Sequence, residues 1–246
     1  KIMHPPRIAF VGALYHITVR CNNKDFFFKE DKDFETYLDI LLRSKKIYKV
    51  QVHAYCITSN HMHLLVSTPY ENTVSSFMQY LNSNYSKAYN KMHGKTGKFW
   101  GGRFYSTIIE SETQFFNTLV YIELNLVRAR VVNDPKDWKW SSYNAHAFGQ
   151  VDRVLDFHPL YTEIGRDSLE RQQNYRNMVY GQMEEKGLLQ NPTLTRGIVF
   201  GSESFVVSIL HLFQGRHSFY SYRKLIPCKQ DAFCINRPHH NHPLRT

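Results

Sequence analysis

Residues 50–66 carry the sequence VQVHAYCITSNHMHLLV, an apolar run rich in β-forming residues that predicts two strands joined at Asn60. Side chains at i and i+2 of a strand point to one face of the sheet. His61 and His63 are therefore expected to present their imidazoles side by side, as half of a site for a divalent metal ion. A His-x-His pair alone is more often structural than metal-binding, so this interpretation needs further ligands from elsewhere in the chain.

The segments around this hairpin alternate between strand-like and helix-like periodicity. Ser111 and Gln114 form a Ser-x-x-Gln capping box, which is expected to begin a long helix reaching about Val131. The expected elements are a strand at 13–21, a helix at 31–46, strands at 48–59 and 61–68, a helix at 72–92, a strand at 104–110 and a helix at 111–131. This β-α-β-β-α-β order predicts an α+β fold, a ferredoxin-like antiparallel sheet with one added C-terminal helix.

The character of the chain changes after the sequence WKWSSY at residues 138–143. A polar amphipathic helix is expected over 168–186 and a short apolar helix over 202–213. We therefore predict two parts, a ferredoxin-like domain at 1–150 and a small helical appendage at 151–246. The end of the chain, from Arg237 onwards, contains three histidines and is expected to be a flexible tail.

The composition indicates a basic globular protein. The 246 residues include 31 Lys and Arg against 21 Asp and Glu, which leaves a net charge of +10, and 15% of the residues are aromatic. Cations bind phosphates and aromatic rings stack on bases, so nucleic acid is a favoured partner, although many basic proteins bind nothing specifically. Apolar runs such as 205–212 are too short for a membrane span, and no signal peptide is expected. Four cysteines without Cys-x-x-Cys spacing favour a reduced, cytoplasmic protein.

The long helix supplies the partners that the histidine pair needs. Its polar stripe, at spacings i, i+4, i+8 and i+11, consists of Asn117, Tyr121, Asn125 and Arg128. If the helix crosses the strand of His61 and His63, the Asn125 oxygen joins two imidazole nitrogens as a third neutral ligand. Mg²⁺ or Mn²⁺ would fit such a set, and Tyr121 could attack phosphorus as a nucleophile, leaving a 5′-phosphotyrosine and a 3′-hydroxyl. A tyrosine at this position is, however, more often part of the core.

Five stretches resemble one family. They are LYHITVR (14–20), HAYCITSNHMHLL (53–65), FWGGRF (99–104), YIELNLVRA (121–129) and WSSY (140–143). Together they resemble the HUH single-strand DNA transposases, and more closely the REP-associated tyrosine transposases, over roughly residues 7–149. The chain departs from the family where Ser59 and Leu126 replace prolines and Cys21 replaces a turn glycine.

The resemblance implies a set of roles for residues of this chain. It makes His61, His63 and Asn125 the metal ligands and Tyr121 the nucleophile, acting on single-stranded DNA with a hairpin. The domesticated relatives can be monomers and the insertion-sequence enzymes dimers, so either state fits this chain. DNA contacts are also expected, with a solvated surface role as the alternative, from Arg103, Arg128, Lys95, Lys98 and Trp100. We expect His16 to be a packed or hydrogen-bonded strand residue.

Our reading is thus a metal-dependent tyrosine transposase in the cytoplasm, associated with the nucleoid when bound to repetitive palindromic DNA. Two alternatives stay open. One is a DNA-hairpin-binding protein whose catalytic site has decayed, and the other is a metal phosphodiesterase that uses water as its nucleophile.

Overall fold

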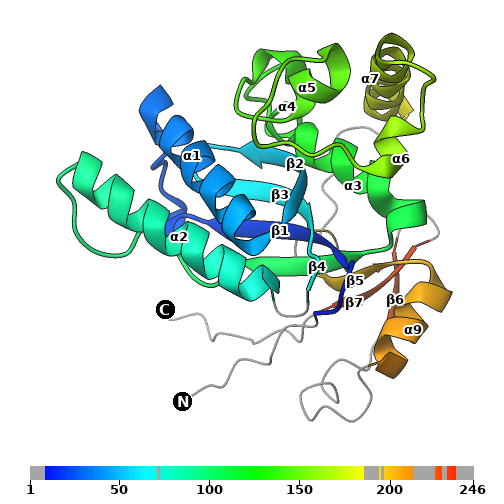
Figure 1. Ribbon diagram of the computed structural model, residues 1–246, viewed down its shortest axis with the longest axis horizontal. Coiled ribbons are helices and arrows are strands. Elements are labelled where there is room, and N and C mark those ends of the chain that lie inside the picture. The colour runs from blue at the N-terminus through cyan, green and yellow to red at the C-terminus, as the bar shows by residue number, and fades with distance from the viewer. Residues whose placement is uncertain are drawn as a thin grey trace, which may run out of the picture.

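A computed structural model describes residues 9–70, 73–185, 194, 197–212, 225–228 and 232–236 of the chain. Its first four strands are β1 (Leu14–Arg20), β2 (Gln51–Ile57), β3 (His61–Ser67) and β4 (Tyr105–Ile109). They lie in the order β2-β3-β1-β4 and pair antiparallel throughout. This is the order of a ferredoxin-like sheet, so the fold predicted from the sequence is confirmed (Figure 1).

Two long helices, α1 (Asp31–Tyr48) and α2 (Thr73–Met92), cover one face of this sheet side by side (Figure 1). Their apolar residues at helical spacing pack against the side chains of β1 and β3 that point to this face, such as Ile17 and Leu64. Short 3₁₀ helices lie at Asn22–Lys24, directly after β1, and at Pro135–Asp137.

The opposite face carries α3 (Ser111–Glu123), which packs on β2 and β3. The sequence predicted one helix from Ser111 to about Val131, and this is wrong. Leu124 adopts φ −82° and ψ 8°, away from the helical ψ of about −42°, and a separate short helix α4 (Asn125–Arg128) follows. The predicted capping box is also wrong, because Glu110 occupies the N-cap position and Ser111 is the first helical residue.

Three further helices, α5 (Tyr143–Phe148), α6 (Pro159–Thr162) and α7 (Ser168–Glu185), gather with α4 beside the β2 end of the sheet (Figure 1). They share a second apolar core with α3, which includes Leu119, Tyr161 and Tyr175. Among the described residues, none of the helices is both long enough and apolar enough to cross a membrane.

The C-terminal part is not purely helical, which corrects the sequence prediction. β5 (Gly197–Gly201) pairs parallel with β4, and β7 (Ala232–Asn236) and β6 (Leu225–Cys228) follow, extending the sheet to the order β2-β3-β1-β4-β5-β7-β6. The helix α9 (Glu203–Leu212) corresponds to the predicted apolar helix. The boundary near residue 150 stays a prediction, and the predicted tail lies outside the described residues.

Candidate metal and tyrosine site

The histidine pair lies on the sheet face that α3 covers. In the antiparallel register His61 is opposite Arg20 and His63 is opposite Thr18 on β1. The neighbours Met62 and Leu64 point into the core beneath α1 and α2, so alternation along β3 sends the two imidazoles to the other face. The sequence prediction that both rings share one face, crossed by the helix that carries Tyr121, is therefore confirmed.

His61 is oriented by residues of its own hairpin turn. Its Nδ1 lies 2.6 Å from the Asn60 Oδ1 and 2.9 Å from the Thr58 Oγ1. The Thr58 hydroxyl donates to the His61 carbonyl, so it can accept from the ring nitrogen. The hairpin thereby occupies Nδ1 of His61, so Nε2 is the ring nitrogen that can meet partners from outside the turn.

His63 is oriented from elsewhere in the fold. Its Nδ1 lies 2.8 Å from Nε2 of His16 on β1, and its Nε2 lies 3.0 Å from Nδ2 of Asn125. The Asn125 side chain also forms a hydrogen bond with His61, so one amide stands against both rings. His16 is buried and hydrogen-bonded, as the sequence predicted for it.

The environment keeps these imidazoles neutral near pH 7. Burial, reinforced by the charge of Arg20, lowers the pKa of His61 to about 4, although the Asn125 hydrogen bond acts in the opposite direction. Burial also lowers the pKa of His16 to about 4. The pKa of His63 lies well below its usual value because of burial first and the neighbouring His16 next. Neutral imidazoles have the lone pair that a metal ion requires.

Tyr121 approaches the histidines of its own chain. Its ring centroid lies 6.2 Å from that of His63 and 6.0 Å from that of His16, with both pairs edge to face. The Arg128 guanidinium covers the tyrosine ring, with its Cζ 3.8 Å from the ring centroid, and its Nη2 donates to the Tyr121 carbonyl. That carbonyl belongs to the last turn of α3, where helical carbonyls have no intrahelical donor.

The break at Leu124 divides the predicted polar stripe between two helices. Tyr121 lies at the end of α3 and Asn125 is the first residue of α4, yet both face the histidines. Asn117 lies a turn further back, where its amide donates to Gln114, so it is not brought into the site.

The nitrogen and oxygen atoms that meet at this site are of the kinds that bind a divalent metal ion. Across the described ranges, no group of three or more His, Cys, Asp or Glu side chains is placed to hold one. The candidate ligands are instead two imidazoles and one carboxamide, His61, His63 and Asn125, which meet on one face of the sheet. The Asn125 amide would have to present its oxygen to an ion, by a half-turn about its last torsion.

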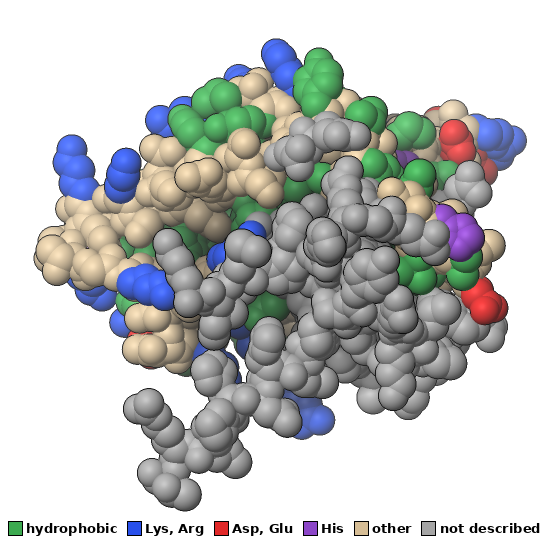
Figure 2. All heavy atoms as spheres, turned by 90° about the horizontal axis from the view of Figure 1, so that it is seen from below, with side chains coloured by type: hydrophobic (Ala, Val, Ile, Leu, Met, Phe, Trp, Pro, Cys, Tyr) green, Lys and Arg blue, Asp and Glu red, His purple; other side chains and the backbone are tan. Residues whose placement is uncertain are grey.

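Lys95, Lys98 and Arg103 are exposed, as a DNA contact requires. Lys95 stands over the rings of Phe27 and Tyr89 at 5.4 and 5.7 Å. Lys and Arg side chains gather at the left end of Figure 2, where α2 and the loop after it lie. These residues stay predicted contacts.

Trp100 does not fit its predicted role as a DNA contact. Its side chain is 8% exposed, and its indole N–H donates to the Asn82 carbonyl. The loop around it instead joins the end of β1, because Gly101 N–H donates to the Arg20 carbonyl at 2.9 Å. A Cβ on Gly101 would lie 2.9 Å from the Cys21 carbonyl oxygen, so the FWGG stretch needs glycine there.

Two charged residues near the site were not assigned from the sequence. Arg20 is exposed and lies opposite His61, beside the basic loop, where a guanidinium can hold a phosphate. Glu123, the last residue of α3, is buried and accepts hydrogen bonds from the Ser142 hydroxyl at 2.5 Å, His146 Nδ1 at 2.8 Å and the Tyr175 hydroxyl at 2.6 Å. The period-two spacing of Arg20 from His16 could have placed both residues on one face of β1. Only the pairing of β1 with β3 shows that Arg20 lies opposite His61.

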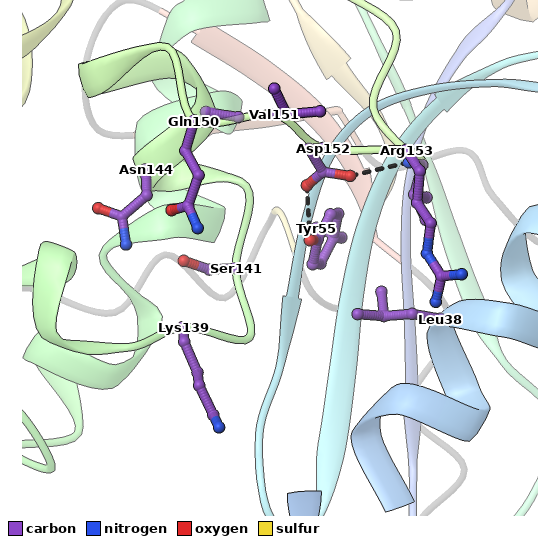
Figure 3. A pocket seen from close by; sticks show the side chains of 11 residues that line it. Leu38, Tyr55, Lys139, Ser141, Asn144, Gln150, Val151, Asp152 and Arg153 are labelled. Carbon is purple, nitrogen blue, oxygen red and sulfur yellow. Dashed lines mark hydrogen bonds between the residues drawn. The ribbon is translucent and has the colours of Figure 1, made fainter. Parts of the chain in front are cut away.

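A cavity of about 330 Å³ lies away from this site (Figure 3). Tyr55 lines it and donates its hydroxyl to Asp152 at 2.6 Å. Tyr55 belongs to the core beneath α1, whereas the histidine pair points to the other face of the sheet. The cavity therefore cannot be part of the histidine and tyrosine centre.

The sheet order is that of a ferredoxin-like fold, and the histidine pair lies on one of its central strands. Residues 9–125 match the model of the family described as "Transposase IS200 like", and the domain that they form belongs to that family. The family resemblance found in the sequence is thus confirmed, and the match supports an enzyme of the transposase type.

Two relatives agree with this assignment. A protein assigned as a REP-associated tyrosine transposase in Haemophilus influenzae is 24% identical over 150 residues, which cover 57% of this chain and 85% of the relative. A solved structure of a REP-associated tyrosine transposase bound to a REP hairpin superposes with a TM-score of 0.51 at 18% identity. It covers 64% of this chain and 93% of that protein, and at this identity it supports the fold alone.

Proposed function

We propose that this transposase cleaves single-stranded, hairpin-forming DNA with Tyr121 as the nucleophile and joins the cut strand to another end. The carrying observation is the edge-to-face approach of Tyr121 to His63, 6.2 Å between ring centroids, within one chain. The amide of Asn125 lies against the same histidine. One chain thus holds the proposed nucleophile together with the proposed ligands, which supports a site built within a monomer.

His61, His63 and Asn125 would hold Mg²⁺ or Mn²⁺ through two imidazole nitrogens and an amide oxygen. All three ligands are neutral, so a bound ion keeps most of its charge for polarising a phosphate oxygen. The lowered pKa values of His61 and His63 support this role because they keep both rings deprotonated at neutral pH.

Tyr121 would attack the scissile phosphorus with its phenolic oxygen. The bond between that oxygen and phosphorus forms while the bond from phosphorus to the 3′ oxygen breaks. The phenol loses its proton and the departing 3′ oxygen gains one, so the products are a 5′-phosphotyrosine and a free 3′-hydroxyl. Arg128, stacked on the tyrosine ring, favours negative charge at the attacking oxygen.

Hairpin DNA is the proposed substrate. The REP-associated transposase that shares this fold is described as bound to a REP hairpin. On this chain, exposed Arg20 lies beside the histidine pair and next to the loop that carries Lys95 and Lys98. A strand held by these cations would bring its phosphates to the site, with affinity that falls as salt rises.

The test compares wild type with Tyr121→Phe on a labelled hairpin oligonucleotide with a single-stranded flank and Mn²⁺. Wild type should give a covalent protein–DNA band on a denaturing gel, and Tyr121→Phe should give none while binding within about threefold in native gels. Tyr70→Phe, an exposed tyrosine away from the site, is the matched control. Binding without any adduct in wild type would favour the decayed binder. Cleavage that survives Tyr121→Phe would favour water as the nucleophile.

A further inference from the structure

We propose that His16 is a positioning residue that selects the metal-binding tautomer of His63, through a hydrogen-bond chain anchored at the carbonyl of Leu194. The inference rests on the proposed function, since it assigns how one of the proposed ligands is prepared. It also gives the C-terminal part of the chain a role in the site, because Leu194 lies just before β5.

The chain of hydrogen bonds has three links. Nδ1 of His16 lies 2.6 Å from the Leu194 carbonyl oxygen, and Nε2 of His16 lies 2.8 Å from Nδ1 of His63. The two rings are within 11° of parallel with centroids 5.1 Å apart, and the short nitrogen–nitrogen distance makes this an in-plane hydrogen bond rather than face-to-face overlap. Nε2 of His63 then lies 3.0 Å from Nδ2 of Asn125.

The hydrogen bond between His16 and the Leu194 carbonyl determines which atom donates in each of the other two hydrogen bonds. A carbonyl oxygen only accepts, so Nδ1 of His16 must carry a proton. In a neutral imidazole the other nitrogen is then an acceptor, so Nδ1 of His63 must donate to it. Nε2 of His63 is left with its lone pair, which faces Asn125, as a metal ligand needs. The opposite tautomer would put a proton where the ion should bind.

The anchor is held by the sheet and shielded from water. The Thr107 hydroxyl on β4 contacts the Leu194 carbonyl at 3.2 Å and donates to the Gly197 carbonyl at 2.8 Å. His16 and His63 are both buried, 1% and 3% exposed, so water cannot replace a lost partner easily. His61 has no such dependence, since its Nδ1 partners are in its own turn.

Outer partners of this kind commonly change metal affinity by 10- to 100-fold when removed. His16→Leu removes the acceptor for Nδ1 of His63, whereas His16→Gln can restore it with its amide oxygen. The matched control is His53→Gln, a buried strand histidine whose ring nitrogens bond to the Asp156 carbonyl and the Ser67 hydroxyl, away from the site.

The tautomers are read from long-range ¹H–¹⁵N spectra of the full-length, metal-free protein with ¹⁵N-labelled histidine. We expect His63 and His16 to be protonated at Nδ1 in wild type, and His63 to lose this preference in His16→Leu. Calorimetric titration with Mn²⁺ should show about 10- to 100-fold weaker binding for His16→Leu, most of it restored in His16→Gln, and no change for His53→Gln.

Protonation of His63 at Nε2 in wild type would overturn the inference, even if a variant failed to fold. So would a His16→Leu variant with unchanged tautomer and unchanged Mn²⁺ affinity. If wild type binds no Mn²⁺, the metal part of the proposed function fails, while the tautomer spectra still decide the role of His16.

Discussion

The Arg128 guanidinium lies on the face of the Tyr121 ring, 3.8 Å from its centroid, and also donates to the Tyr121 backbone carbonyl. One side chain thus covers the aromatic ring and caps the end of α3. Leu124, whose backbone breaks the helix between α3 and α4, lies between the two residues. Arg128 thus connects the short helix after the break with the end of α3 and with the proposed nucleophile.

Arg128→Lys should lower both stability and cleavage rate. Lysine keeps the charge but loses the planar stack and the forked donor. We expect the free energy of unfolding to fall by about 1–2 kcal/mol and covalent adduct to form roughly tenfold more slowly. Urea unfolding and a time course of adduct formation measure the two effects. Arg130→Lys, at an exposed position, should match wild type, and equal behaviour of the two variants would refute the role of Arg128.

Glu123→Ala should destabilise the protein strongly. The buried carboxylate accepts from Ser142, His146 and Tyr175, and its removal leaves all three donors without this partner. Breaking a buried charged network in this way costs about 3–5 kcal/mol. Glu184→Ala, at an exposed position of α7, should change the unfolding free energy by no more than about 0.5 kcal/mol. A loss below about 1 kcal/mol for Glu123→Ala in urea titrations would contradict the network.

Mn²⁺ should stabilise the folded chain through His61, His63 and Asn125. At a concentration 100 times the dissociation constant, a ligand that binds only the folded state adds about 2.7 kcal/mol. Differential scanning calorimetry should show the midpoint rising with Mn²⁺ and returning with EDTA. The shift should disappear in His61→Ala and in Asn125→Ala but persist in His53→Gln. A shift of wild-type size in either alanine variant would remove that residue from the ligand set.

Acid should weaken the fold between about pH 6.5 and pH 4 in the absence of metal. Unfolded histidines take up a proton near pH 6.5, whereas burial lowers the pKa of His16, His53 and His61 to about 4. The unfolded chain therefore binds more protons in this window, and stability falls as pH falls. Each group contributes on the order of 3 kcal/mol once pH 4 is reached.

Urea unfolding at pH 5, 6 and 7 measures this slope while most carboxylates stay ionised. His53→Gln should reduce the slope, because one of the buried imidazoles is gone. Equal stability of wild type at pH 5 and pH 7 would show that these imidazoles are not buried in the neutral form.

Local patterns were enough for the four-stranded sheet. Period-two alternation in β1, β2 and β3, with apolar residues at helical spacing in α1 and α2, predicted each of these elements to within a few residues. The break at Leu124 was not predictable in the same way, because Leu124, Asn125 and Leu126 include no glycine or proline that would indicate the end of a helix. The family resemblance places a proline at position 126, and that residue would have marked the start of α4, where a first-turn N–H has no intrahelical partner.

The three C-terminal strands were missed for a different reason. β5 has five residues and a glycine at each end, so it carries little alternation of its own. It becomes a strand because its backbone pairs in parallel with β4, a contact between residues about 90 positions apart. Trp100 was predicted to contact DNA from the loop or to lie in solvent, whereas its ring packs in the core beneath α2.

The sequence by itself determined the ferredoxin-like order of elements, the shared face of His61 and His63, and the candidate residues Tyr121 and Asn125. These follow from residue spacing, which strand and helix geometry convert directly into direction. The tertiary structure alone decided the distance from Tyr121 to His63 and the stacking of Arg128 on the Tyr121 ring. It also decided the hydrogen bonds that join Leu194, His16 and His63. Those contacts join positions far apart in the chain, where strand pairing and burial, rather than local periodicity, set which atoms meet.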